Sequence, residues 1–146
     1  MPRYLLIVDF QPGTDPTPME EWTPDEVDAH MAYYRRLNDD LAATGELVGG
    51  EILSGPDVSY VVRSSGRDAT SVTEGPFAEF SEWVAGFQVV ETATVERALE
   101  IAALVSAVPG RGGRPLAQPI QVREVVGTPP RDAVEMAGWL DDVQGV

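Results

Sequence analysis

The residue best suited to proton transfer is His30, the one histidine of the chain. An imidazole titrates near neutral pH, and a nearby carboxylate would raise its pKa and select one tautomer. At about 100° per residue, His30 falls between Leu37 and Tyr34 in the apolar arc of VDAHMAYYRRL, so we expect it to point toward a sheet. Two interpretations stay open: a general acid or base, or a buried neutral histidine bonded to a tyrosine or a backbone carbonyl.

Glu74 is the first candidate for a carboxylate beside His30. It begins the string Glu-Gly-Pro-Phe, in which glycine permits unusual φ values and proline fixes the direction of the following chain. Such a turn could aim Glu74 into a cavity, with Phe77 as a binding residue. The alternative is a structural corner in which the carboxylate accepts backbone N–H bonds. The corner is favoured, because turn chemistry explains the string without a substrate.

Glu51 is the second candidate carboxylate, and it follows two glycines in an apolar run. Consecutive glycines in a strand suggest a bulge, or close approach by a ligand or another backbone. Strand alternation would place Glu51 on the face of Leu47 and Leu53. An inward carboxylate needs a partner, such as Arg63 across a hairpin or His30 above, and a structural ion pair is the favoured outcome.

Other site chemistries lack the residues they need. With one histidine and no HxxxH or His-x-His pair, no metal is assigned, and no cofactor is expected. The chain has no cysteine, and all its basic residues are arginines, which excludes thiolate and lysine Schiff-base chemistry. The glycine-rich strings at 64–66 and 110–114 resemble phosphate loops by composition alone. They lack the strand-loop-helix context, so both are interpreted as plain turns.

Length and charge limit the class of protein. A chain of 146 residues with 43% hydrophobic residues fits one globular domain. The net charge of −14 would repel phosphate backbones and anionic membrane surfaces, so neither nucleic acid nor a membrane is expected as a partner. The apolar run at 4–8 is too short for a signal segment, and a cytoplasmic location is expected.

Patterning predicts an α+β domain that positions these side chains. A capping box at Thr23-Pro24-Asp25-Glu26 predicts a helix that ends near Gly45. Strands 46–53 and 59–64 are predicted to form a hairpin around Gly55-Pro56-Asp57. The remaining elements are a first strand at 3–9, a strand start at 71, a strand at 87–91, a helix capped by Thr94 and a last strand at 119–125. This order is the ferredoxin-like split βαβ arrangement with an added strand segment.

Four blocks of sequence resemble the YCII-related (DGPF) family: RYLLIV from Arg3, ATGELVGGE at 43–51, VTEGPFAE at 72–79 and WVAGFQVVE at 83–91. The family signature DGPF is here Glu74-Gly-Pro-Phe77, so the carboxylate is kept on a longer side chain. The resemblance covers the chain from Arg3 to Val126. It divides the chain into a domain at 1–127 and a tail at 128–146, which is either a docking helix or a mobile end.

The resemblance implies a dimeric α+β barrel with a pocket between each sheet and its helices. It also implies a site built on a histidine early in the first helix, the place of His30, and an acidic residue just after the second helix. The corresponding stretch here, 106–110, contains no carboxylate. A homodimer is expected on the further ground that an antiparallel sheet with helices for one face must have its other face covered.

Two functions follow from these expectations. In the first, the chain is an enzyme in which His30 moves a proton on a small organic substrate, with Glu74 or Glu51 orienting it. In the second, it is a non-catalytic dimeric module that binds a small-molecule ligand or has a regulatory role. Because some DGPF relatives are associated with alternative sigma factors, the resemblance links that role to transcriptional regulation.

Overall fold

The computed structural model describes residues 1–9, 13–66, 69–75 and 83–144. Three short 3-10 turns, η1 (Met19–Glu21), η2 (Pro56–Val58) and η3 (Arg111–Gly113), connect larger elements. The strands and α-helices, in chain order, are β1 (Arg3–Asp9), α1 (Pro24–Ala43), β2 (Leu47–Ile52), β3 (Tyr60–Ser64), β4 (Thr70–Glu74), β5 (Val84–Glu91), α2 (Val95–Ser106), β6 (Ile120–Glu124) and α3 (Ala133–Gln144).

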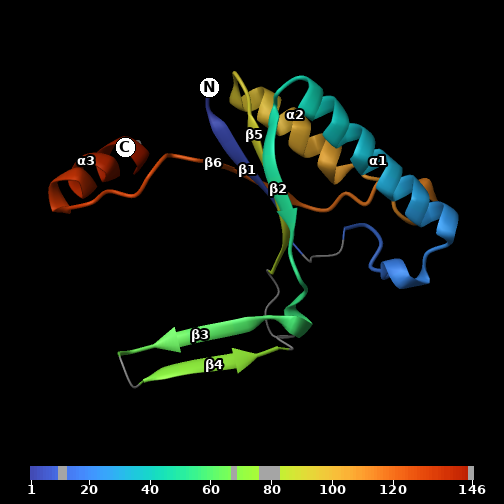
Figure 1. The fold of residues 1–146 in the computed structure, drawn as a ribbon. Helices are drawn as coiled ribbons and strands as arrows, with labels where there is room; N and C mark the ends of the chain where they lie inside the picture. Colours follow the sequence, from blue (N-terminus) through green and yellow to red (C-terminus); the bar gives the residue numbers. More distant parts are fainter. Residues whose placement is uncertain (10–12, 67–68, 76–82, 145–146) are drawn as a thin grey trace.

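Four of these strands form an antiparallel sheet of order β2-β5-β1-β6. Helices α1 and α2 lie against one face of this sheet, and the opposite face carries no helix of the described residues (Figure 1). The predicted α+β class is confirmed. The strand order, with a helix between β1 and β2 and another between β5 and β6, is compatible with the ferredoxin-like arrangement.

The core lies between the sheet and the two helices. Leu6 of β1, Val90 of β5 and Ile101 of α2 have no exposed surface, because strand alternation and helical periodicity direct all three inward. Leu41 completes this cluster from α1. Burial of each of these side chains contributes about 1.5–3 kcal/mol of transfer free energy, so this layer is the main source of stability in the body.

Local signals define the ends of α1 as predicted. The Thr23 hydroxyl accepts from the amide of Glu26, and the Glu26 carboxylate accepts from the amide of Thr23, which completes the capping box. At the other end Gly45 has a φ of 78°, a value that favours glycine, and its amide donates to Ala42. These two ends place His30 on the buried stripe of the helix.

The predicted hairpin between residues 46–53 and 59–64 is wrong. Strand β2 pairs with β5 at the edge of the sheet, whereas β3 pairs with β4 in a separate two-stranded ribbon, the β3–β4 ribbon (Figure 1). The physical reason is the turn after Gly55, where Pro56 starts η2 and the chain leaves the sheet instead of reversing beside β2. As a result, Arg63 lies opposite Ser71 and not across from β2.

A bulge in β2 also reverses the predicted face of Glu51. The register with β5 shifts after Leu47, and the backbone at Gly50 comes so close that an added Cβ would be 2.7 Å from the carbonyl oxygen of Phe87. Leu47 packs against the core, but Glu51 lies opposite Phe87 and faces away from the helices. The expectation that Glu51 and Leu47 share a face is therefore wrong, because the bulge breaks the alternation.

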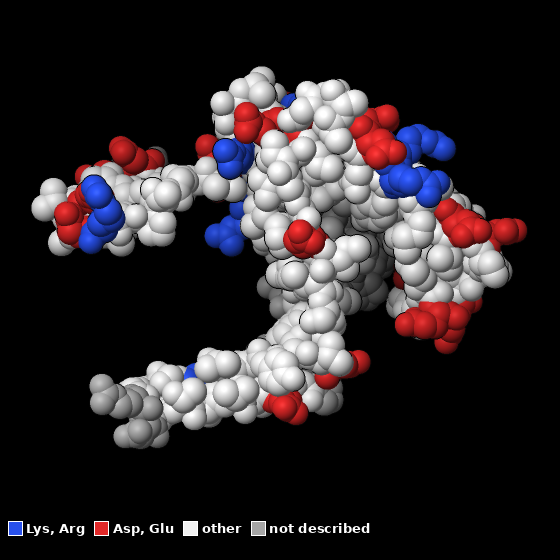
Figure 2. All heavy atoms as spheres, viewed as in Figure 1, with Lys and Arg blue, Asp and Glu red and all other residues white. Residues whose placement is uncertain are grey.

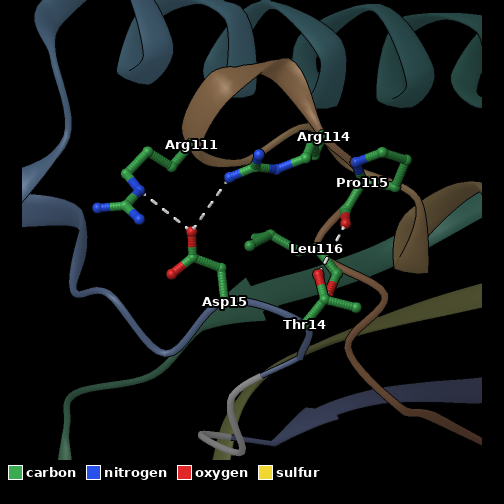
Figure 3. Close-up of a pocket in the computed structure, with 6 residues that line it drawn as sticks. All are labelled: Thr14, Asp15, Arg111, Arg114, Pro115 and Leu116. Atoms are coloured by element: carbon green, nitrogen blue, oxygen red, sulfur yellow. Dashed lines mark hydrogen bonds and ion pairs between the residues drawn. The ribbon is translucent and has the colours of Figure 1, made fainter.

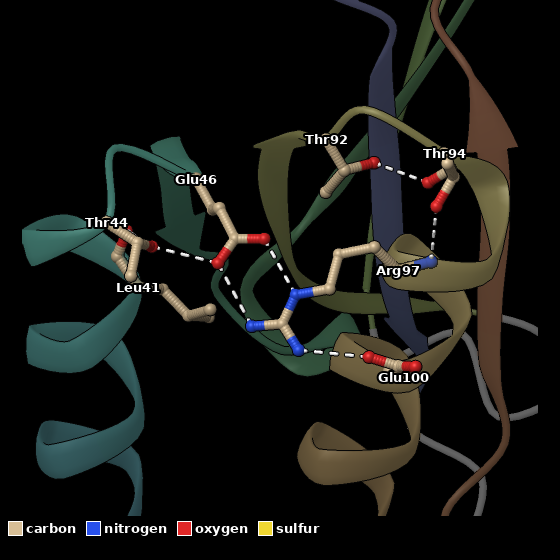
Figure 4. Close-up of polar contacts among 7 residues, drawn as sticks. All are labelled: Leu41, Thr44, Glu46, Thr92, Thr94, Arg97 and Glu100. Carbon is tan, nitrogen blue, oxygen red and sulfur yellow. Dashed lines mark hydrogen bonds and ion pairs between the residues drawn. The ribbon is translucent and has the colours of Figure 1, made fainter.

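A polar network joins the start of β2 to α2 (Figure 4). The Glu46 carboxylate accepts from Arg97 Nε at 2.7 Å and Nη2 at 3.0 Å, and from the Thr44 hydroxyl at 2.9 Å. Arg97 also donates to Glu100 at 3.1 Å. The hydrogen bonds from Arg97 lower the pKa of Glu46, and those to Glu46 and Glu100 raise the pKa of Arg97.

Two parts of the chain project from this body with apolar side chains exposed. One face of the β3–β4 ribbon carries Tyr60, Val62 and Val72, which are 65%, 62% and 59% exposed. The tail forms α3, which stands apart from the sheet and exposes Met136, Leu140 and Val143 along one side (Figure 1). The ribbon is largely uncharged between its ends, whereas charged side chains gather on the body and on α3 (Figure 2).

Among the described residues, none of the helices combines the length and the apolar character that a membrane span requires.

Candidate functional site

His30 is buried, with 8% of its surface exposed. Its Nδ1 lies 2.9 Å from the carbonyl oxygen of Pro109. A carbonyl can accept but not donate, so Nδ1 carries the proton, and in the neutral ring Nε2 is the acceptor. The rings of Trp22 and Tyr34 pack edge-on against the imidazole, with centroids 5.4 and 5.2 Å away. The imidazole is thus held by one carbonyl and two aromatic rings.

The elements around His30 are the beginning of α1 and the end of α2. Because α1 runs antiparallel to α2, its second turn lies beside Pro109, the third residue after α2. The stretch 106–110 is where the family resemblance placed an acidic partner. In this chain a main-chain carbonyl of that stretch takes the acceptor position, and no hydrogen bond or ion pair of the described residues joins His30 to a carboxylate.

Tyrosines extend the contact between α1 and α2. The Tyr33 hydroxyl donates to the carbonyl of Leu104 at 2.6 Å, and Tyr34 packs against both His30 and Tyr33. Burial raises the pKa of Tyr34, and the neighbouring Tyr33 raises it further, so its phenol stays neutral at physiological pH. This arrangement is typical of a packed helix interface.

The loop at 109–116 closes over the beginning of α1. Its Gly112 amide donates to the carboxylate of Glu26, and its Gly110 amide donates to the Arg114 carbonyl at 2.7 Å. The segment before η1 pairs with the same loop, since the Thr14 amide donates to the Leu116 carbonyl at 2.8 Å. Both sides of this loop are therefore held by backbone hydrogen bonds.

A recess of about 540 Å³ lies between this loop and the segment at 14–15 (Figure 3). It is lined by Thr14, Asp15, Arg111, Arg114, Pro115 and Leu116. Asp15 Oδ2 is 3.2 Å from Arg111 Nε and 4.0 Å from Arg114 Nη2, so the carboxylate lies between two guanidinium groups. Hydrogen bonds from Thr17 lower the pKa of Asp15 most, and the two arginines lower it further.

The structure does not bring the other predicted site residues to His30. Glu74 and Arg63 are exposed on the β3–β4 ribbon, and Glu51 is exposed on the uncovered face of the sheet. Within the described ranges, no hydrogen bond or ion pair joins any of these three to His30 or to one another. Phe77 lies outside the described residues.

The glycine of the string that begins at Glu74 has a structural explanation. A Cβ added to Gly75 would lie 2.0 Å from the carbonyl oxygen of Pro56, and the Gly75 amide donates to Ser59 at 2.9 Å. Only a residue without a side chain fits against η2 at this distance. This contact explains Gly75 alone: the Glu74 carboxylate accepts no backbone N–H bond within the described residues, and Pro76 and Phe77 lie outside them.

The residues of the recess and one buried acid were not predicted from the sequence. The sequence predicted a plain turn around Arg111 and Arg114, and no local signal could show that Asp15 lies beside it. Asp9 is 7% exposed at the end of β1, where its carboxylate accepts from Gln121 Nε2 at 3.0 Å. Its position at the end of an apolar strand gave no sign of that burial.

No group of three or more histidine, aspartate or glutamate side chains in the described part of the chain is placed to hold a metal ion. The model of the YCII-related domain matches residues 3–109 of the chain. No curated protein matches the chain. The matched stretch runs from β1 to the carbonyl that binds His30, so it includes both elements that hold the imidazole.

Proposed function

The chain belongs to the YCII-related family, and on that premise we propose that it is a homodimeric, non-catalytic binding module. The observation that carries this proposal is the environment of His30. A general acid or base must reach its substrate, but this imidazole is buried between two aromatic rings and donates to a main-chain carbonyl. These contacts support a structural role, in which His30 holds α1 against the end of α2.

The domain boundaries follow from the same proposal. Residues 1–127 form the YCII-related domain. Strand β6 belongs to it although it lies beyond the matched stretch, because β6 pairs with the central strand β1. Residues 128–146 are a docking tail, in which α3 makes no extensive contact with the described strands or helices of its own chain.

The uncovered face of the sheet supports a second copy as the binding partner. Alternation directs Leu6 to the helices, so its neighbours Leu5 and Ile7 face the other way, opposite Val89 and Phe87. Ile7 is buried within the single chain, whereas Leu5, Phe87 and Val89 are half-buried. An apolar centre of this kind is a common feature of surfaces that bind another protein. In the dimeric α+β barrel of the proposal, the two sheets pack face to face over these side chains.

Charges at the two edges of this face favour a symmetric partner. Glu51 lies on β2 at one edge and Arg123 on β6 at the other, and neither has an ion-pair partner among the described residues. A two-fold axis parallel to the strands would put the β2 edge of each copy over the β6 edge of the other. Glu51 would then lie over the β6 edge of the partner, level with Gln121 and two residues along the strand from Arg123, twice in each dimer.

The β3–β4 ribbon and α3 also support a face-to-face dimer. A two-stranded ribbon is at most marginally stable in water, and this ribbon exposes an apolar face. Both the ribbon and α3 leave the body on the side that the helices do not cover (Figure 1). In the proposed dimer they reach the partner and bury these side chains.

Sedimentation velocity over a range of concentrations tests the proposal. We expect a dimer for the wild type, weaker dimers for Glu51→Arg and for Arg123→Glu, and recovery when both changes are combined, because the pair is then re-formed with reversed charge. Asp39→Arg, an equal change of charge on the exposed side of α1, is the control and should dimerise like the wild type.

A wild type that stays monomeric at micromolar concentration would overturn the dimer. If neither substitution weakens the dimer, or if the double variant dimerises as weakly as the single variants, the β2 edge of one copy does not lie over the β6 edge of the other.

A further inference from the structure

The recess beside Asp15 has the chemistry of an anion site. We infer that it binds the oxyanion group of a small molecule, a carboxylate or a phosphate, through Arg111 and Arg114. This deepens the proposed function, because it names a ligand class for the binding module. All the groups involved belong to one chain, so anion binding and dimer formation are measured separately and can fail separately.

The side chains that line the recess carry more positive than negative charge. Two arginines share the single carboxylate of Asp15 here. In the other ion pairs of the described residues, the carboxylates equal or outnumber the arginines, as at Arg97 with Glu46 and Glu100. Glu26 also attracts Arg111 and accepts from the amides of Thr23 and Gly112, but its carboxylate does not line the recess, where Asp15 is the acidic residue.

Both arginines of the recess have N–H groups that no acceptor of the described residues uses. Asp15 Oδ1 accepts from the Thr17 amide at 3.0 Å, which leaves Oδ2 for both arginines. Each guanidinium presents five N–H groups, and neither donates to another acceptor of the described residues. Arg111 and Arg114 are 47% and 71% exposed, so both can turn donors toward a ligand. Guanidinium groups bind carboxylate and phosphate oxygens in pairs, a geometry that suits this ligand class.

Close backbone contacts hold the frame of the recess. Gly13 packs so closely that an added Cβ would lie 1.8 Å from the carbonyl oxygen of Leu116, and Thr14 pairs with the same residue. Gly112 and Gly113 have φ values of 70° and 72°, which favour glycine and set the two arginines on one tight turn. A frame held in advance reduces the entropy lost when a ligand binds.

The test is a nuclear magnetic resonance titration of the full chain with inorganic phosphate and, separately, with succinate, against sodium chloride at equal ionic strength. We expect at least one oxyanion to shift the amides of Gly110, Gly112 and Gly113 with a saturable curve. If phosphate alone does so, the ligand is a phosphate compound; if succinate alone does so, it is a carboxylate. Arg114→Gln, which removes an exposed side chain with a long ion pair, should weaken the binding about fivefold.

Asp15→Asn gives the opposite prediction. It keeps an acceptor for the Thr17 amide and removes the negative charge between the arginines, so oxyanions should bind about fivefold more tightly. Arg36→Gln, on the exposed surface of α1, is the control and should leave the titration unchanged. Binding that Arg114→Gln does not weaken, or that Asp15→Asn weakens, would overturn the inference, as would a wild type that no oxyanion shifts.

Discussion

His30 connects the parts of the chain that hold the candidate site. Its Nδ1 donates to the carbonyl of Pro109, the first residue of the loop at 109–116. Two residues further along that loop, Arg111 lines the anion recess. An imidazole can therefore matter to ligand binding without touching the ligand. Its hydrogen bond to Pro109 should therefore contribute to the stability of the fold.

His30→Phe measures this contribution, because it keeps an aromatic ring between Trp22 and Tyr34 but removes the donor. The Pro109 carbonyl would then lose its partner, and we expect the free energy of unfolding to fall by about 1–3 kcal/mol in urea titrations. Tyr34→Phe removes a hydroxyl that makes no hydrogen bond within the described residues and should change stability by less than about 0.5 kcal/mol. If His30→Phe is as stable as the wild type, the structural role is wrong.

Glu46 gives a prediction for the dependence of stability on pH. Arg97 holds the pKa of Glu46 below its ordinary value of 4.5 in the folded chain, so the unfolded chain takes up the proton first. The contribution of this pair is complete above pH 4.5 and is lost as the pH falls through the lowered pKa.

In Glu46→Gln this loss cannot occur. We expect the stability difference between wild type and Glu46→Gln, measured by urea unfolding, to be largest near neutral pH and to shrink steadily below pH 4.5. Glu20→Gln changes an exposed residue without an ion pair in the described ranges, and its stability should depend on pH as that of the wild type does. A stability difference that is independent of pH would show that the charge of Glu46 contributes nothing.

At the scale of elements, the β3–β4 ribbon depends on one close contact at its root. Gly75 lies against Pro56 of η2, and Gly75→Ala would force these two backbones apart. We expect the amides of Val61 and Thr73, a hydrogen-bonded pair of the ribbon, to lose protection in hydrogen exchange, while the amide of Leu6 in the sheet keeps it.

Gly138→Ala in α3, where an added Cβ meets no atom within 4 Å, is the control and should leave the ribbon unchanged. Equal protection of the ribbon in Gly75→Ala and in the wild type would mean that the contact with Pro56 is not needed.

For the whole molecule, local sequence signals predicted where helices and strands lie but not which strands pair with each other. The limits of β1 and both caps of α1 followed from neighbouring residues, such as Thr23 with Glu26, since those interactions lie within one turn of chain. The pairing of β2 depended on β5, more than thirty residues away, and a short apolar strand does not specify its partner.

The candidate site was likewise predicted only where local sequence signals determine it. The burial of His30 followed from helical periodicity, but its acceptor at Pro109 is set by how two helices pack. Asp15 and Arg114 come together across nearly the whole length of the chain, and their meeting depends on the loop that covers α1. The face of Glu51 depended on one extra residue in a strand.

The apolar face of the ribbon has a consequence for mixtures of chains. In the proposed symmetric dimer, every interface residue is present twice, so Val72→Asp would introduce two buried charges into a pure variant and one into a hybrid with the wild type. A damaged chain would thus impair the intact chain with which it pairs. In a cell that produces both, the deficit in functional dimers would exceed the fraction of damaged chains.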